Sequence, residues 1–240
     1  MQHLDYISII KKTGSAAGHM RGRGLTDVIK SGYYPNYVFS IAVKGSARDP
    51  GIKPPFGVQG EKKGRWRGNL VDHQVQAWIK GALKDATPST PERKAACLDA
   101  SLHQFSRAFI ELTQRLELTP IGTQVVVQNE QCNIATLVDA VFLNTQGHIV
   151  LVELKTGFDG YNDASNGDMN ADFAFLSNAP ANQHQIQLAF TQCMFESTFK
   201  EFGEVHAVVI RMTDSGAHVT PLDRRIFQTT QAILQKGIPL

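Results

Sequence analysis

The spacing of apolar residues predicts four helices around a strand-rich middle of the chain. Residues 68–83 place their apolar side chains on one arc at the helical repeat, which is typical of an amphipathic helix. A second helix is predicted over 90–116, because that stretch opens on Thr-Pro-Glu and then carries a regular apolar stripe. A third helix is predicted from about Asn182, and a fourth follows Asp223, which is suited to cap it.

Short apolar runs rich in β-branched residues predict the strands. Three runs follow the second helix and two follow the third, at 123–130, 137–143, 148–155, 204–212 and 218–222. They are too short for long helices and are separated by turn-forming residues. The predicted order is therefore helix, helix, three strands, helix, strand, short strand, helix.

One stretch between the third strand and the third helix has no such pattern. Residues 158–173 are polar, acidic and rich in glycine, so we expect a long loop that contributes no core residues. Its acidic residues lack the spacing of an EF-hand calcium loop. A loop of this length next to a site is often a lid.

The composition is that of a globular chain. Of its 240 residues, 42% are hydrophobic and 19% are charged, so the chain can bury a sizeable core as one domain or as a domain with an appendage. No apolar run approaches a membrane span, and no signal segment opens the chain. The three cysteines show no CxxC spacing, which argues against a zinc site or a disulfide framework. We therefore expect an intracellular protein with no membrane partner.

Charge is unevenly distributed along the chain. Residues 1–67 contain 12 Lys/Arg and 4 Asp/Glu, a net of +8, whereas residues 68–240 have a net of −6. A basic segment rich in Gly and Pro next to an acidic core suits nucleic-acid binding, because phosphate contacts dominate such affinity. We therefore divide the chain into a nucleic-acid-binding extension, 1–67, and a main domain, 68–240.

The candidate chemistry lies on the second and third predicted strands. Asp139 lies on one, and Glu153-Leu154-Lys155 ends the other, with Glu153 and Lys155 on the same strand face because side chains alternate. Two carboxylates and an ammonium that converge in this way suit Mg²⁺, which prefers oxygen ligands. The alternative is an ordinary ion pair between Glu153 and Lys155 at a strand end.

The spacing of these residues resembles a known signature. Asp139, thirteen residues and then Glu153-Leu154-Lys155 are similar to the motif of the PD-(D/E)xK nuclease superfamily. Val138 stands where the motif has proline, a departure that is common in the RecB-type and lambda-exonuclease-type branch. The resemblance implies a restriction-endonuclease-like fold of the α/β class, an α-β-β-β-α-β mixed sheet flanked by helices, with the basic N-terminal extension added.

Three polar residues outside the motif extend the resemblance. His73 follows Gly68 with the G-x₄-H spacing of RecB-type domains, in which the histidine ligates metal, although a lone histidine at a helix edge is more often a packing residue. Gln187 resembles the helix glutamine that contacts substrate in these nucleases, but Thr191 replaces the usual aromatic, and a Gln-rich surface helix is the alternative. Glu130 resembles an upstream acidic ligand, or is a solvated strand end.

The resemblance implies a metal-dependent phosphodiester hydrolase. Asp139 and Glu153 would hold one or two Mg²⁺ or Mn²⁺ ions, together with the carbonyl of Leu154 and with His73. Lys155 would position water, and Gln187 with Gln183 would contact the substrate. The expected function is that of a DNA exonuclease, acting on single strands or duplex ends in replication, recombination or repair. The alternatives are a structure-specific or cap-snatching-type endonuclease, and a non-catalytic DNA-binding module on this fold.

The basic extension supplies the expected DNA contacts. Its Lys-Lys-Gly-Arg-Trp-Arg run combines four positive charges with an aromatic ring that could stack on a base. The alternatives are a solvated loop with the tryptophan tucked into the core, and charge that serves docking on the acidic domain or on a protein partner. The candidate nucleic-acid-binding residues of the extension are Arg21, Arg23, Lys62, Lys63, Arg65, Trp66 and Arg67.

Overall fold

The structure is a computed structural model of the 240-residue chain. It describes the backbone of residues 6–10, 23–34, 61–84, 102–157, 160–164 and 167–237. Within these stretches, the side chains of residues 61–63, 65 and 84 are not described.

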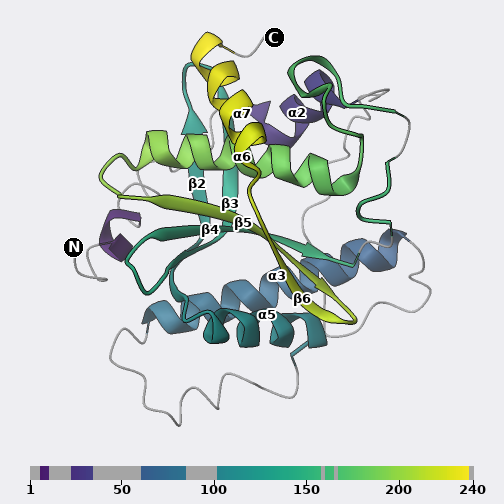
Figure 1. The fold of residues 1–240 in the computed structure, drawn as a ribbon. Helices are drawn as coiled ribbons and strands as arrows, with labels where there is room; N and C mark the ends of the chain where they lie inside the picture. The colour runs from purple at the N-terminus through teal and green to yellow at the C-terminus, as the bar shows by residue number, and fades with distance from the viewer. Residues whose placement is uncertain are drawn as a thin grey trace.

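A six-stranded mixed sheet forms the centre of the molecule (Figure 1). Its strands are β1 (Arg23–Gly24), β2 (Thr119–Asn129), β3 (Ile134–Leu143), β4 (Ile149–Thr156), β5 (Val205–Thr213) and β6 (Gly216–Pro221). The order across the sheet is β2-β3-β4-β5-β6, and β1 pairs with the beginning of β3. The pairs β1–β3 and β4–β5 are parallel, and the others are antiparallel.

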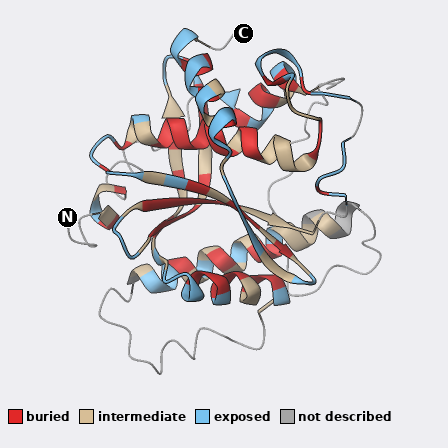
Figure 2. Cartoon of the chain, viewed as in Figure 1, coloured by how far each residue is buried: buried red, intermediate tan, exposed pale blue. Residues whose placement is uncertain are grey.

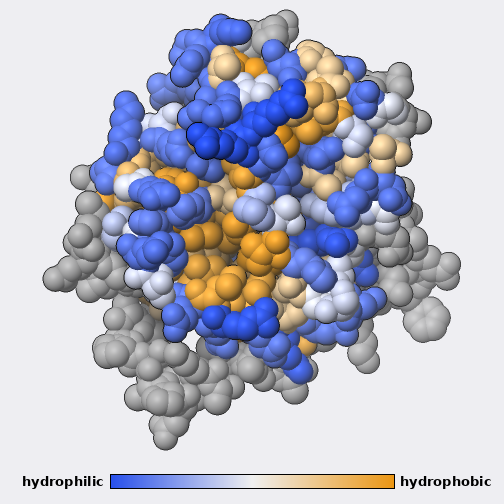
Figure 3. All heavy atoms as spheres, viewed as in Figure 1, coloured by the Kyte–Doolittle hydropathy of each residue, from blue (hydrophilic) through white to orange (hydrophobic). Residues whose placement is uncertain are grey.

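Helices cover both faces of this sheet. One face carries α6 (Pro180–Thr198), with α2 (Leu25–Tyr33), α7 (Arg224–Lys236) and the short η1 (Ala171–Phe173) near it. The other face carries α3 (Glu61–Lys84) and α5 (Gln104–Arg115). Each face therefore has a buried apolar cluster of its own, and Figure 2 shows the buried residues on the sheet and on the helix sides that meet it. In Figure 3, hydrophilic side chains cover α7, and apolar ones gather between the sheet and α5.

The expected α/β fold class is confirmed. Apart from the short η1, the described elements from α3 to α7 run helix, helix, three strands, helix, strand, strand, helix, as the apolar pattern predicts. The predicted cap is also present, because Asp223 Oδ1 accepts hydrogen bonds from the backbone N–H groups of Arg225 and Ile226 at 2.8 and 3.0 Å. The mixed sheet with helices on both faces follows from this order.

Three local expectations were wrong. The run Lys62–Arg67 is helical, because α3 begins at Glu61 rather than at residue 68. The described helix α5 begins at Gln104, with the side chain of His103 as its cap, so no single helix covers 90–116; residues 85–101 lie outside the described part. The stretch after β4 does contribute to the core, because an aromatic or apolar side chain recurs within its polar sequence: Tyr161, Met169 and Phe173 are buried.

The described parts of the N-terminal segment belong to the same sheet and core. β1 pairs with β3, and Leu25, Val28 and Ile29 of α2 are buried in the cluster on the α6 face. The helix α3 continues across residue 67, so the boundary between 67 and 68 falls within a helix. The division into two functional parts stays a prediction. In the described part of the chain, no helix has the length and apolar character to cross a membrane.

The end of β4 packs against the first turns of α3. The guanidinium of Arg67 lies 5.2 Å from the centre of the Phe105 ring. Gly157, directly after β4, has a φ of +75°, and a Cβ on it would lie far inside van der Waals contact with Arg67 Nη2. The backbone conformation therefore favours glycine here, and a Cβ would in addition displace the end of the flexible Arg67 side chain.

We expect Gly157→Ala to destabilise the protein by more than the ~1–2 kcal/mol that a left-handed conformation costs an L-residue. Gly147→Ala is the matched control, because Gly147 has a φ of +81° and no atom lies within 4 Å of the point that its Cβ would occupy. Urea unfolding of the two variants separates backbone strain from the clash with Arg67. Equal losses of unfolding free energy would show that the guanidinium moves aside freely.

Candidate active site

Strand β3 loses its regular pairing at Asp139. The β2–β3 pairs Thr123↔Ala140 and Val125↔Val138 lie on either side of it, and Gln124, which would oppose Asp139, has a φ of +51°. On the other edge, the β3–β4 pairs run only from Leu143↔Ile149 to Ala140↔Val152. The two strands therefore diverge where Asp139 faces the end of β4.

The carboxylate of Asp139 bridges this divergence. Its Oδ2 accepts a hydrogen bond from the backbone N–H of Leu154 at 2.8 Å, and its backbone oxygen accepts one from Thr123 Oγ1 at 2.8 Å. A side-chain oxygen thus satisfies a strand N–H that a neighbouring carbonyl would otherwise bind. The backbone oxygen of Asp139 is therefore bonded to β2 and its carboxylate to β4.

Glu153 is the second acidic residue at this point, and it is only 3% exposed. Its Oε1 accepts hydrogen bonds from Lys155 Nζ at 2.5 Å and from Gln187 Nε2 of α6 at 2.8 Å. Alternation along β4 places Glu153 and Lys155 toward α6, and Leu154 packs against the cluster on the α3 side. The structure therefore brings together the four residues Asp139, Glu153, Lys155 and Gln187.

Burial and mutual repulsion set the charges of this group. Burial, followed by the nearby charge of Glu153, raises the pKa of Asp139 well above its usual range. Burial by itself would lower the pKa of Lys155, but the charges of Glu153 and Asp139 outweigh it and raise that pKa. The nearby carboxylates therefore keep the lysine protonated.

Helix α3 adds a third carboxylate, Asp72, that the sequence analysis did not select. The pKa of Asp72 is raised, mainly by burial and further by the charge of Glu153. Its hydrogen bond with Gln76 and the charges of His73 and Lys155 oppose this increase. Its Oδ2 accepts a hydrogen bond from Gln76 Nε2 at 2.8 Å, and its Oδ1 is buried without a hydrogen-bond partner. The Asp72/Gln76 pair, one helical turn apart beside the apolar arc, is the sequence signal that could have indicated it.

The neighbouring His73 has a different environment. It is exposed, and the interaction described for it is with the charge of Asp72, not with Asp139 or Glu153. Glu130 is also exposed, at the far end of β2, where it accepts a long hydrogen bond of 3.4 Å from Gln128. Within the described residues, neither side chain joins the group around Glu153.

Polar and aromatic side chains from other elements surround Glu153 and Lys155. Burial, with the charge of Glu153, raises the pKa of Tyr34. The guanidinium of Arg211 lies over the ring of Tyr161, 4.6 Å from the ring centre. The hydroxyl of Tyr161 lies 3.1 Å from His184 Nδ1. Burial, with the charges of Lys155 and Lys30, lowers the pKa of His184 to about 2, so this imidazole is neutral at neutral pH.

Other predicted site residues have separate contacts or lie outside the described part. On α6, Gln183 Nε2 donates to Asn178 Oδ1 at 2.8 Å, not to the Glu153 group. Trp66 and Arg67 are half-buried in α3, and Arg23 is exposed in β1. Arg21 and the side chains of Lys62, Lys63 and Arg65 lie outside the described residues.

The donor chemistry of the site fits a hard divalent cation. Asp72, Asp139 and Glu153 offer carboxylate oxygens from α3, β3 and β4, the ligand type that Mg²⁺ and Mn²⁺ take. The buried, unpartnered Oδ1 of Asp72 and the raised pKa of Asp139 both indicate that the protein alone does not stabilise ionised carboxylates here, as a bound cation would. A second group of metal-ligand side chains, His148, Glu204 and His206, lies at the other end of β4.

Comparisons with known proteins add only distant likeness. No protein-family model matches the chain, and no curated protein matches it. Among solved structures, a candidate exonuclease from Eubacterium rectale is similar at a TM-score of 0.37 and 13% identity, over 74% of this chain and 69% of that chain. The protein SSO0001 is similar at a TM-score of 0.30 and 11% identity, over 71% of this chain and 88% of that one. Similarity at this level assigns neither a family nor an activity to this chain.

We expect Asp139→Asn to stabilise the metal-free protein at neutral pH. Between the ordinary pKa of 3.8 and the raised pKa of the folded state, the unfolded chain releases the Asp139 proton while the folded protein keeps it. Stability therefore falls as pH rises through this window, and the asparagine variant escapes that loss while keeping an oxygen that can accept from Leu154. Urea unfolding from pH 5 to pH 8, with a chelator present, measures the widening difference.

Glu111→Gln is the control for this experiment, because Glu111 is exposed on α5. It should show the same pH dependence of unfolding as the unchanged protein. A lower unfolding free energy for Asp139→Asn than for the unchanged protein at pH 8 would contradict the repulsion described here.

Proposed function

We propose that this chain is a metal-dependent nuclease that hydrolyses phosphodiester bonds. The observation that supports it is the buried group formed by Asp139, Glu153 and Lys155 where β3 and β4 diverge. Buried charges are costly, and a group that served stability would have its charges compensated. Here the pKa of Asp139 is raised by burial and repulsion and Asp72 keeps an unpartnered oxygen, which favours a site built to receive a cation.

Each residue has a role in this proposal. Asp139, Glu153 and Asp72 would hold one or two Mg²⁺ or Mn²⁺ ions, with the carbonyl of Leu154 as a further ligand. The ion, when bound, supplies an activated water and offsets the negative charge that builds up on the phosphate. Lys155 stays protonated beside Glu153, where its ammonium can orient the attacking water or steady the scissile phosphate.

The residues around this group suit a phosphodiester substrate. Gln187 fixes Glu153 through its hydrogen bond and so keeps the carboxylate in one orientation. Arg211, held over the ring of Tyr161, adds a positive charge on β5 beside the site. The neutral imidazole of His184 supports Tyr161 and brings no competing charge.

We infer that DNA is the substrate and that cleavage starts from ends. This follows from the similarity of the Asp139/Glu153/Lys155 spacing to DNA-processing exonucleases. The net charge of +8 on residues 1–67 would capture the polyanion next to an acidic domain, with the exposed Arg23 as one contact. The two alternatives are an endonuclease and a DNA-binding module, and the complete acidic-plus-lysine set argues against the second.

We expect Asp139→Asn and Glu153→Gln each to abolish cleavage without unfolding the protein, because each removes charge that holds the cation. The assay uses end-labelled linear DNA and covalently closed circles with Mg²⁺, and circular dichroism verifies the fold. An exonuclease degrades only the linear DNA, whereas an endonuclease also cuts circles. Glu111→Gln is the control and should cleave normally. Cleavage by both acidic variants at the unchanged rate would end the proposal.

We expect Lys155→Ala to lower the maximal rate by at least ~10²-fold, the scale of a positioned charge-stabilising group. The Mg²⁺ concentration for half-maximal activity should change little, because the ammonium does not ligate the ion. Lys236→Ala, at an exposed position in the last turn of α7, is the matched control. A preserved maximal rate with weakened Mg²⁺ dependence would assign Lys155 a structural role instead.

A further inference from the structure

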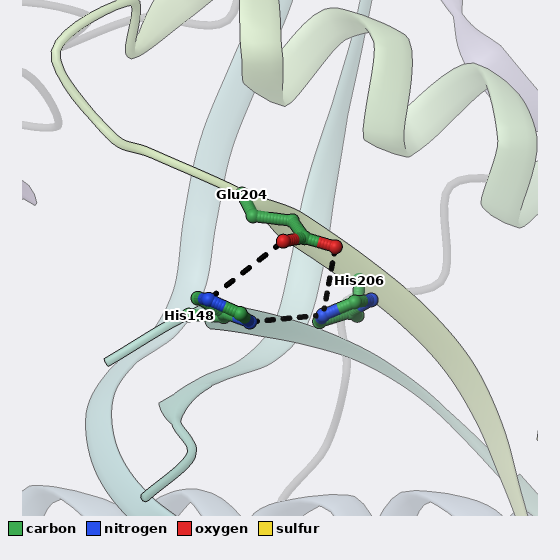
Figure 4. Close-up of side chains that lie close together, drawn as sticks. All are labelled: His148, Glu204 and His206. Carbon is green, nitrogen blue, oxygen red and sulfur yellow. Dashed lines mark hydrogen bonds and ion pairs between the residues drawn. The ribbon is translucent and has the colours of Figure 1, made fainter. Parts of the chain in front are cut away.

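A second group of polar side chains lies at the beginning of β4 and β5 (Figure 4). His148 directly precedes β4, Glu204 directly precedes β5, and His206 is the second residue of β5. Figure 4 shows the three side chains directed toward one another from these two neighbouring strands. None of the three has a role in the proposed cleavage reaction.

Backbone pairing fixes the positions of these side chains. The parallel ladder pairs Ile149 with Val205, and the N–H of Ile149 also donates to the backbone oxygen of Glu204 at 3.0 Å. The turn before β4 adds a further constraint, because Asn144 Oδ1 accepts from the N–H of His148 at 2.9 Å. His148 and Glu204 are thus held side by side, and His206 follows two residues along on the same strand face.

The group is separate from the candidate active site. Alternation places His206 on the face of Val208 and Ile210, which pack toward α3 and α5, whereas Glu153 is directed toward α6. His148 also lies five residues before Glu153, about 16 Å along the strand. The two groups therefore occupy opposite ends and opposite faces of β4.

The three side chains lie close enough together to contact one small ion. His148 Nε2 lies 3.7 Å from Glu204 Oε2, His206 Nε2 lies 3.5 Å from Glu204 Oε1, and His148 Nδ1 lies 3.3 Å from His206 Nε2. One ligand atom from each residue can be chosen so that all three lie within 4.8 Å of one another. Tetrahedral bonds of about 2.0–2.1 Å would place neighbouring ligand atoms roughly 3.4 Å apart, so side-chain rotation would bring these atoms together around a bound ion.

The ligand types and the exposure of the group favour zinc over Mg²⁺. Two imidazoles with one carboxylate form a ligand set that zinc takes, whereas Mg²⁺ prefers oxygen ligands alone. The side chains are 30%, 60% and 45% exposed for His148, Glu204 and His206, so an ion can enter from solvent and keep water as its fourth ligand. The cysteine spacing argued against zinc, but no cysteine takes part here.

We propose that His148, Glu204 and His206 bind one zinc ion, which joins the beginnings of β4 and β5. Because the ladder sets the ligand positions only in the folded chain, the bound ion stabilises the folded state. This inference does not depend on nuclease activity. The test measures zinc binding and not DNA cleavage, so either proposal can fail while the other holds.

The test uses the full-length Asp139→Asn protein, freed of metal by a chelator, so that the candidate active site contributes little. Zinc affinity is measured by competition with a chromophoric chelator, and Co²⁺ serves as a spectroscopic probe of tetrahedral nitrogen and oxygen ligation. We expect one zinc ion per chain with a Kd below about 10 μM. Zinc, but not Mg²⁺ at the same concentration, should raise Tm.

In the same background, zinc binding should weaken at least ~10-fold in each of three variants, His148→Ala, His206→Ala and Glu204→Gln. Loss of a residue that only supports a ligand already weakens metal binding by this much, so loss of a ligand should weaken it at least as far. His218→Ala is the matched control, because His218 is exposed on β6 and hydrogen-bonds to Thr213 and Ser215. It should leave zinc affinity unchanged, and circular dichroism should show every variant folded. A Kd above about 10 μM, or equal affinity in the two histidine variants and the control, would overturn the proposal.

Discussion

The hydrogen bond from the Leu154 N–H to the Asp139 carboxylate is the contact on which the rest of the site depends. It replaces a strand-to-strand bond at the point where β3 and β4 separate, so the polar backbone of β4 stays satisfied although its neighbour has turned away. The same bond places a carboxylate beside Glu153. Without it, divergence of the strands would leave an unpaired N–H group and no fixed position for the first acidic residue.

The acidic residues lie close enough together to change the pKa values of the side chains at the site. Burial and the nearby charge of Glu153 raise the pKa of Asp139, and the charges of Glu153 and Asp139 raise the pKa of Lys155 and so keep it protonated. Gln187 reaches Glu153 from α6 and Asp72 interacts with it from α3, so both helix layers meet at this end of the sheet. Residues from both helix layers therefore meet where the pairing of β3 with β4 ends.

The order of the helices and strands, and the face on which some side chains lie, can be predicted from the sequence. The apolar periodicity predicts the order of helices and strands because each element must bury one face, and this requirement is local in sequence. Alternation along β4 correctly places Glu153 and Lys155 on one face, since it needs only the strand geometry. The capping role of Asp223 is also predicted correctly, because its hydrogen bonds reach only residues within the next turn.

Other features were decided by contacts between residues far apart in the chain. Sequence spacing pointed to His73 on α3, but the helix places the neighbouring Asp72 in interaction with Glu153 and leaves His73 exposed. Tyr161 lies in a stretch that looks like a solvated loop, yet packing against His184 and Arg211 buries it. The pairing of β4 with β5 likewise brings His148 to Glu204 and His206 across more than fifty positions of sequence. Local pattern determines which face of an element is apolar, whereas the rotation of one element against another determines which polar residues meet.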